Sequence, residues 1–334
     1  MAKQAAIRVA VVGAGAVGMR AARQLHETDG VVEVVVASRR ASHASAVVAD
    51  LGDGARVGEW PRVAGEVDVV VIAGPDSLQA DYARIAIGDG AHAVTTASSI
   101  DAVDGVVGLD ARARSLDRIA VAGVAMSPGL SCLLARHAAR DIDVVDEVHV
   151  AKVGTGGPEC ARSTHQALRG PAALWRDGRW QSEPAGSGRE LCWFPEPLGG
   201  LDCYAASSAE PNLLSVAFPT ARRITSRAAA TRRDRATTWL PMLRPPHPEG
   251  LIGGVRVEVR GWTDGVSTTA IVGAVDRPAV VAGTLAALVA VASARGELSA
   301  GAGGVAGLAK NPGALLAALA HRGVKVASFD GSTS

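Results

Sequence analysis

The chain has 334 residues, of which 48% are hydrophobic and 20% are charged, and its formal net charge at pH 7 is +1. This balance is typical of a globular protein with room for two domains, and it excludes a disordered chain. A charge so close to zero offers no general attraction to nucleic acid or to an anionic membrane, so we expect neither as a partner.

The N-terminal stretch "MAKQAAIRVAVVGAG" leads directly into a predicted strand and lacks the apolar core and cleavage site of a signal peptide. The four cysteines are widely spaced and form no CxxC, so we expect no metal site and no disulfide framework. They are Cys132, Cys160, Cys192 and Cys203. Together these features predict a cytoplasmic protein.

The first third of the chain alternates short apolar runs with helical patterns. Runs rich in Val, Ile and Ala, without polar alternation, are typical of parallel strands that are covered on both faces. We predict strands at 7–12, 31–37, 67–73, 91–95 and 119–125, with helices between them, for example at 15–26 and 76–87. This order predicts an α/β fold with a doubly wound parallel sheet.

Gly13, Gly15 and Gly18 form a G-x-G-x-x-G motif between the first predicted strand and the first helix. The first glycine permits a tight turn, the second lets the backbone approach a pyrophosphate, and the third lets the helix pack on the strand. Free amides at the helix start, around Ala16 and Val17, would favour the anion. The motif therefore predicts a dinucleotide-binding Rossmann domain; the alternative is a structural turn without a ligand.

The second predicted strand ends in Ser38, Arg39 and Arg40, where sites specific for NAD usually have an Asp or Glu. A hydroxyl and guanidinium groups can bind a 2′-phosphate, which a carboxylate would repel. We therefore predict NADP(H) as the cofactor, with NAD(H) as the alternative. The two arginines could instead be a solvated helix start.

Two further loops are expected at the carboxyl edge of the sheet, where the cofactor crevice of such folds lies. One contains Gly74 and Pro75, and the other, "TTASS", contains Thr96 and Ser98. We predict that these residues line the cofactor site.

The sequence changes in character after about residue 145, and five of the six tryptophans lie in this part. Alternating runs on either side of Asp264-Gly265 predict an antiparallel hairpin. The uncharged segment 278–294 approaches the length of a membrane span, but we predict a helix buried between domains. We expect a Rossmann domain at 1–130, a mixed α/β substrate and dimerisation domain at 131–300, and a C-terminal segment at 301–334 that returns to the first domain.

The segment 109–139 contains Leu109-Asp110, then Gly123, then Pro128-Gly129-Leu130. In this pattern the chain resembles the saccharopine dehydrogenase-like oxidoreductases. The resemblance implies a Rossmann domain, a mixed α/β second domain that forms a dimer, and NAD(P)-linked chemistry at a carbon–nitrogen bond of an amino-acid-like substrate. From the residues themselves, Ser127 and Pro128 predict the N-cap and first position of a helix that could hold a substrate carboxylate.

Hydride transfer requires positioning and a proton donor or acceptor. Histidine is the residue type most often used as a general acid, and Lys152 precedes a glycine-rich loop, so we predict His165 and Lys152 as candidate catalytic residues. Ser127, Arg169, Arg189 and Glu196 are candidate substrate contacts. Each of these residues could instead be an ordinary surface or packing residue.

Three functions are compatible with these features. The first is an NADP(H)-dependent oxidoreductase, a homodimer acting on a small amino or imino acid. The second is a dehydrogenase of the glucose–fructose oxidoreductase type, although "TTASS" stands where that family usually has E-K-P. The third is a non-catalytic NADP(H)-binding redox sensor.

Overall fold

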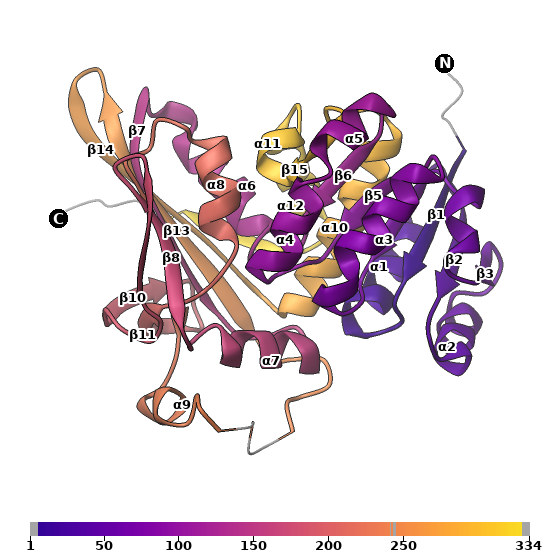
Figure 1. Cartoon of the computed structure of the whole chain (residues 1–334), viewed down its shortest axis with the longest axis horizontal. Helices are drawn as coiled ribbons and strands as arrows, with labels where there is room; N and C mark the ends of the chain where they lie inside the picture. The colour runs from indigo at the N-terminus through magenta and orange to yellow at the C-terminus, as the bar shows by residue number, and fades with distance from the viewer. Residues whose placement is uncertain (1–5, 241, 243–244, 329–334) are drawn as a thin grey trace. The chain divides into compact units, whose positions relative to one another are not determined.

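The computed structural model describes residues 6–240, 242 and 245–328, and its contacts divide the chain into two units. Unit 1 comprises Met1–Ala97, Asp101–Ala125 and Ala279–Leu319, and unit 2 comprises Ser98–Ile100, Met126–Pro278 and Ala320–Ser334. The two units are each made of several chain segments, and the boundaries at 130 and 300 remain a prediction. Figure 1 shows the elements of both units.

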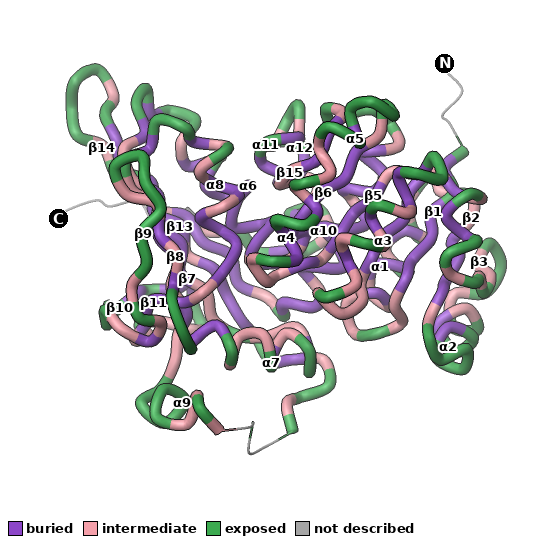
Figure 2. Tube along the Cα trace, viewed as in Figure 1, coloured by how far each residue is buried: buried purple, intermediate pink, exposed green. Residues whose placement is uncertain are grey.

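Unit 1 is built on a parallel sheet of seven strands in the order β15-β6-β5-β4-β1-β2-β3. The strands are β1 Ile7–Val12, β2 Val31–Ala37, β3 Ala55–Val57, β4 Val69–Ile72, β5 His92–Thr95, β6 Ile119–Ala122 and β15 Gly301–Gly304. The central strands are almost wholly buried, as the purple traces in Figure 2 show, because helices cover both faces. The predicted doubly wound sheet is confirmed.

The helices that lie wholly or mostly in unit 1 are α1 Ala16–His26, α2 Ala41–Leu51, α3 Asp76–Gly88, α4 Ile100–Val107, α5 Asp110–Ser115, α10 Pro278–Ala294, α11 Val305–Leu308 and α12 Pro312–His321. A 3₁₀ turn, η1, lies at Arg62–Glu66. Helix α10 is the uncharged segment noted above. It packs closely on α1, because a Cβ added to Gly283 would lie 2.7 Å from Arg20 Cβ. Within the described residues, no helix has both the length and the apolar character needed to span a membrane.

Unit 2 carries a mixed sheet of nine strands with the main order β10-β11-β12-β7-β13-β14-β16, while β8 pairs with β12 and with β9. The strands are β7 Val144–Val153, β8 Pro171–Arg176, β9 Arg179–Pro184, β10 Glu190–Phe194, β11 Gly199–Ala205, β12 Arg223–Ala229, β13 Gly253–Thr263, β14 Val266–Asp276 and β16 Lys325–Ser328. The helices are α6 Leu130–Ala138, α7 Pro158–Gln166, α8 Glu210–Ala217 and α9 Arg232–Ala236, with a 3₁₀ turn η2 at Ala139–Asp141.

The predicted hairpin is confirmed as β13 and β14, which pair antiparallel along their whole length. Its two turn residues, Asp264 and Gly265, have φ values of 50° and 76°. Positive φ at both central positions is the geometry of a two-residue hairpin turn that matches the twist of the strands.

The predicted start of α6 is wrong by two residues. The N-cap is Gly129, with φ 116°, and the helix begins at Leu130 instead of Pro128. Ser127 therefore lies outside the helix, and its hydroxyl is free to bond to another element. The spacing of Ser127 and Pro128 resembled a cap, but only glycine tolerates the left-handed backbone found at the cap position.

Candidate functional site

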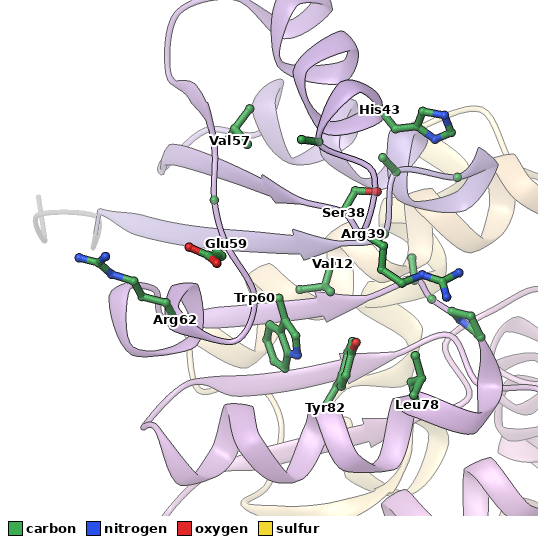
Figure 3. A pocket seen from close by; sticks show the side chains of 18 of the residues that line it. Val12, Ser38, Arg39, His43, Val57, Glu59, Trp60, Arg62, Leu78 and Tyr82 are labelled. Atoms are coloured by element: carbon green, nitrogen blue, oxygen red, sulfur yellow. The ribbon is translucent and has the colours of Figure 1, made fainter.

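A groove of about 870 Å³ lies in unit 1 at the carboxyl ends of β1 and β4 (Figure 3). The strand order reverses here: β2 and β3 continue on one side of β1, and β4, β5 and β6 on the other. Ligands of open α/β sheets bind at such a switch point. Gly13 follows β1 and Gly74 follows β4, so the two turns form one end of the groove.

The three glycines of the motif meet different surroundings. A Cβ on Gly13, whose φ is +119°, would lie 2.3 Å from the Ala73 carbonyl oxygen, and a Cβ on Gly18 would lie 1.8 Å from the Gly13 carbonyl oxygen. A Cβ on Gly15 would meet no protein atom within 4 Å, although Gly15 lines the groove. The first and third positions therefore require glycine because a side chain there would clash with the backbone. The second glycine leaves free space beside the start of the helix.

Helix α1 begins at this free space. Its N-cap is Gly15, which has no side chain to accept a bond from the first-turn amides, and no acidic residue lies in that turn. Unsatisfied amides and the aligned peptide dipoles attract an anion. The turn thus fits the pyrophosphate of a dinucleotide, with Gly15 beside it and the amides of α1 facing it.

The end of β2 presents basic and polar groups to the same groove. Ser38, Arg39 and His43 line it, and Arg39 is exposed. Another lining arginine, Arg56, is already paired with Glu33 and Glu66 at 2.8 Å each. Within the described part of the chain Arg39 forms no ion pair, so its charge is available to a ligand.

Several predicted cofactor residues do not line the groove. Gly18 packs against Gly13, Arg40 is the N-cap of α2, and the Thr96 hydroxyl donates to the Ile72 carbonyl at 3.3 Å. Ser98 is grouped with unit 2. Ala16 and Val17 contribute only the backbone of the first helical turn. Predicted residues that do line it are Gly13, Gly15, Ser38, Arg39, Gly74 and Pro75.

A cluster on the far side of the groove was not predicted from the sequence. Trp60, Leu78 and Tyr82, which we call the apolar wall, all line it. The signal available was Trp60, since it is the one tryptophan that precedes residue 145. Nothing in the local sequence indicates that it meets Tyr82, which lies on another element.

In unit 2, His165 and Arg169 lie together. Both side chains bond to the backbone carbonyl of Leu240, His165 through Nε2 at 3.0 Å and Arg169 through a terminal guanidinium nitrogen at 2.8 Å. The same Nε2 also lies 3.3 Å from a terminal guanidinium nitrogen of Arg169. Because the carbonyl only accepts and the guanidinium only donates, Nε2 of His165 can form a hydrogen bond to one of them at a time, according to its tautomer. Arg169 lies three residues beyond the end of α7.

The other candidate residues of unit 2 have separate surroundings. Lys152 lies on β7, Arg189 pairs with Asp202 at 3.0 Å, and Glu196 is exposed in the loop after β10. The hydrogen bond that Arg189 donates to Asp202 raises the pKa of Arg189. Among the described residues, no hydrogen bond or ion pair joins any of these three to His165 or Arg169.

Ser127 donates a short hydrogen bond to Oε1 of Glu210, the first residue of α8. Glu210 is fully buried, and its second oxygen, Oε2, has no partner among the described residues. The two residues are 83 positions apart in the chain. The Ser127 hydroxyl is thus engaged in holding α8 to the turn before α6.

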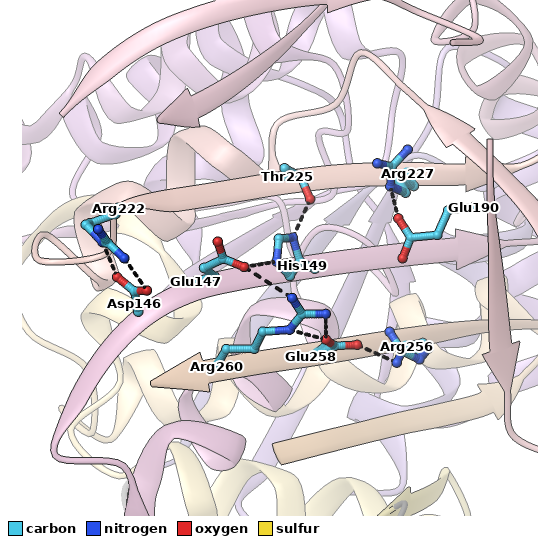
Figure 4. A network of polar contacts seen from close by, with 10 residues as sticks. All are labelled: Asp146, Glu147, His149, Glu190, Arg222, Thr225, Arg227, Arg256, Glu258 and Arg260. Atoms are coloured by element: carbon cyan, nitrogen blue, oxygen red, sulfur yellow. Dashed lines mark hydrogen bonds and ion pairs between the residues drawn. The ribbon is translucent and has the colours of Figure 1, made fainter. Parts of the chain in front are cut away.

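A polar network crosses three strands of the unit 2 sheet (Figure 4). His149 on β7 bonds to Thr225 at 2.7 Å and to Glu147 at 3.0 Å. On β13, the buried Glu258 accepts from Arg256 and Arg260 at 2.5 Å each. Burial alone would raise the pKa of Glu258, but the hydrogen bonds and charges of the two arginines outweigh it and lower that pKa. Such pairing is what makes a buried carboxylate tolerable.

Among the residues described, no group of three or more His, Cys, Asp or Glu side chains could hold a metal ion. The groove of unit 1 is the candidate functional site.

Residues 7–95, which contain the glycine turn and β1 to β5, match the model of the GFO_IDH_MocA family, an oxidoreductase family with an NAD-binding Rossmann fold. This match identifies an NAD(P)-dependent oxidoreductase. The predicted enzyme class is thus confirmed, on the part of the chain that carries the groove. No curated protein matches the chain by sequence.

Solved structures share the fold over nearly the whole length. Saccharopine dehydrogenase (L-Glu forming) from Saccharomyces cerevisiae superposes with a TM-score of 0.69 at 15% identity, covering 97% of this chain and all of that chain. DAP dehydrogenase from C. glutamicum, in complex with DAP, gives 0.52 at 17% identity and covers 96% and 99% of the two chains. GenD2 from gentamicin A biosynthesis, in complex with NAD, gives 0.51 at 16% identity and covers 98% and 97%. The resemblance to saccharopine dehydrogenase-like enzymes is confirmed in the fold.

Proposed function

We propose that the oxidoreductase prefers NADP(H) and acts at a carbon–nitrogen bond of a small amino or imino acid. The observation that carries the first part is the end of β2, where Ser38 and the unpaired Arg39 face the groove. A 2′-phosphate carries about two negative charges, and charge-assisted bonds to a guanidinium are among the strongest hydrogen bonds in proteins. NAD lacks this phosphate and therefore forms no such charge-assisted bond with Arg39.

Different residues of the groove bind different parts of the cofactor. Gly13 and Gly74 shape the two turns, Gly15 leaves room for the pyrophosphate, and the first turn of α1 offers its amides to it. Arg39 and Ser38 hold the 2′-phosphate, with Arg40 beside them at the start of α2. When bound, the nicotinamide supplies the redox chemistry, and the chain orients it.

The carbon–nitrogen part of the proposal has weaker support and is tested separately. Two of the proteins with this fold are named for amino-acid substrates, saccharopine and DAP. In unit 2, Arg169 and Arg189 are exposed cations that could bind a substrate carboxylate, and Glu196 is an exposed carboxylate that could bind the substrate's amino group. The hydroxyl of Ser127, the remaining candidate contact, is bonded to Glu210. His165 and Lys152 are the candidates to hold the proton that moves with the redox step.

A titration of the cofactor tests the NADP preference. The double variant Arg39→Ala, Arg40→Ala should weaken NADPH about ten- to a hundred-fold, because it removes charged hydrogen bonds, and should change NADH much less. The control is Arg232→Ala with Arg233→Ala, two exposed arginines of α9. It should bind both coenzymes as the wild type does. Equal weakening of NADPH and NADH by the first pair would remove the 2′-phosphate argument.

Turnover tests the catalytic residues. NADPH oxidation with panels of keto acids plus amines should reveal a substrate. His165→Ala or Lys152→Ala should then lower turnover while NADPH binding stays intact. Unchanged turnover in both variants would exclude them from catalysis.

The family match favours a second candidate, a dehydrogenase of the glucose–fructose oxidoreductase type. Such an enzyme should oxidise a polyol or sugar in the same assay and ignore keto acids with amines. A protein that binds NADPH and turns over neither class would instead be the redox sensor.

A further inference from the structure

Two of the four cysteines form a buried pair that neither the groove nor the proposed reaction uses. Cys192 lies on β10 and Cys203 on β11, and both side chains are buried in one apolar cluster. In the antiparallel register Cys192 is opposite Leu201, and Cys203 is opposite Glu190. The two cysteines are therefore diagonal neighbours on one face of the hairpin. The fold thus holds two thiols side by side.

The two thiols differ in how readily each loses its proton. Cys203 donates a hydrogen bond to the sulfur of Cys192, which lowers the pKa of Cys192 and raises the pKa of Cys203. At Cys192, burial and the charge of Glu190 act in the opposite direction. The charges of Arg256 and Arg227, shown in Figure 4, partly offset them. Because a thiolate is the form that attacks a disulfide, Cys192 is the nucleophile of the pair and Cys203 the second thiol.

Strand β10 lies at the edge of the sheet, which gives a route to Cys192. In the strand order its hydrogen-bonded neighbour is β11, and the residues on either side of Cys192, Leu191 and Trp193, are 57% and 60% exposed. An edge strand opens when the bonds to one neighbour break, so it opens more readily than a central strand. A small molecule can therefore reach the sulfur of Cys192 when β10 opens locally.

We propose that Cys192 and Cys203 are a redox-active dithiol, which a low-molecular-weight disulfide such as oxidised glutathione converts to an intramolecular disulfide. The Cys192 thiolate attacks one sulfur of oxidised glutathione, which forms a mixed disulfide and releases one glutathione thiolate. The Cys203 sulfur then attacks the Cys192 sulfur, the mixed disulfide breaks, and the second glutathione leaves with the Cys203 proton. Two electrons pass from the dithiol to glutathione disulfide, so the protein is oxidised and two glutathione molecules are released in reduced form.

The hydrogen bond between the thiols fits this order of steps. While Cys192 is a thiolate, it holds the proton of Cys203. Once the Cys192 sulfur is bonded to glutathione it carries no charge, so that hold is lost and Cys203 can react. A disulfide brings its sulfurs closer than two hydrogen-bonded thiols, and β10 can shift toward β11 because it is an edge strand. The product joins the two strands that flank the loop of Glu196, a candidate substrate contact.

The test uses the full chain, reduced and free of coenzyme, in glutathione buffers with an increasing oxidised fraction. The parent protein carries Cys160→Ala, because the partly exposed Cys160 could form a mixed disulfide of its own. Its three remaining thiols should fall to one, that of Cys132, since burial raises the pKa of this thiol to about 12. Cleavage after Trp193, which lies between the two cysteines, should leave two peptides joined by a disulfide.

Single variants of the parent protein test the two roles. Cys203→Ser should accumulate the mixed disulfide between Cys192 and glutathione, because no second thiol displaces the glutathione. Cys192→Ser should form no cross-link and should take up no glutathione on Cys203. Circular dichroism checks the fold of each variant. If either variant does not fold, the thiol count and the peptide map of the parent protein decide.

Several results would overturn the proposal. Three free thiols in the most oxidising buffer would show the pair to be ordinary packing residues. A cross-link that involves Cys132, or one that forms only in urea, would overturn it as well. Glutathione on Cys203 in Cys192→Ser, as abundant as on Cys192 in Cys203→Ser, would contradict the assigned roles. None of these results bears on the proposed function, because neither coenzyme nor substrate is present.

Discussion

The glycines of the β1–α1 turn differ in what a methyl group would meet at each of them. At Gly13 and Gly18 it would meet backbone carbonyl oxygens of the protein, at 2.3 and 1.8 Å. At Gly15 it would enter the space assigned to the pyrophosphate, where no protein atom lies within 4 Å. Substitutions at these glycines can therefore distinguish an effect on folding from an effect on cofactor binding.

Gly15→Ala should fold with a melting temperature within about 2 °C of the wild type, because its φ of −87° is accessible to alanine. The same variant should lose most of its affinity for NADPH, since the methyl group occupies the phosphate site. Calorimetric titration and thermal unfolding measure the two effects. Gly18→Ala is the matched change and should lower the melting temperature clearly, by overpacking. Wild-type affinity in Gly15→Ala would place the phosphates elsewhere.

The predicted site residues that line the groove are those whose position depends on neighbours in the sequence. The glycine turn and the Ser38-Arg39 pair follow strands directly, so their place at the sheet edge could be inferred. The apolar wall could not, because Trp60 and Tyr82 meet only when the β3 loop packs beside α3. The Ser127–Glu210 bond joins elements 83 residues apart and left no local pattern.

At the scale of elements, one carboxylate adds a contact where the chain returns to the first sheet. Asp110 opens α5, and its Oδ1 accepts from the Ala302 amide of β15 at 2.8 Å, while Oδ2 accepts from Arg114. The bond from Arg114 lowers the pKa of Asp110. Gly301 lies so close that a Cβ there would be 2.5 Å from Oδ1. Strand β15 is thus joined to the sheet by α5 as well as by β6.

Asp110→Ala should lower the free energy of unfolding by about 1–3 kcal/mol, because it leaves the amide of the buried Ala302 without an acceptor. Urea denaturation measures the change. Asp81→Ala is the matched control, since Asp81 forms an exposed pair with Arg84 on α3 and should cost less than about 0.5 kcal/mol. Similar losses in the two variants would show that Asp110 acts only as a surface charge.

The network of Figure 4 makes the second sheet sensitive to acid. Burial lowers the pKa of His149, although the hydrogen bond and charge of Glu147 act in the opposite direction. In the unfolded chain the same group titrates near about 6.5. As the pH falls below that value, the unfolded chain takes up a proton that the folded protein resists, so the free energy of unfolding decreases.

His149→Gln should reduce this pH dependence between about pH 6.5 and 5. The pKa values of His92 and His137 are also lowered, but these groups contribute equally in both proteins and cancel in the comparison. Denaturation at a series of pH values measures the slopes, with pH 8 as the reference. Identical slopes in variant and wild type would exclude His149 as the sensor.

At the scale of the whole molecule, sequence reasoning found the two kinds of sheet because each has its own hydrophobic period. Unbroken apolar runs predicted the parallel sheet of unit 1, and alternation around Asp264-Gly265 predicted β13 and β14. Alternation also runs through Arg256, Glu258 and Arg260 on β13, which places the three on one face, and this signal was missed. The start of α6 was mispredicted because the conformation of Gly129 depends on the surrounding fold.

The central claim is that the groove of unit 1 binds a nicotinamide dinucleotide with its phosphates at the start of α1. Isothermal titration of the full chain with NADPH, and separately with NADH, tests it most directly. We predict saturable binding of both coenzymes, with the smaller dissociation constant for NADPH. Absence of saturation with either coenzyme at millimolar concentration would contradict the account, and tighter binding of NADH would contradict the role given to Arg39.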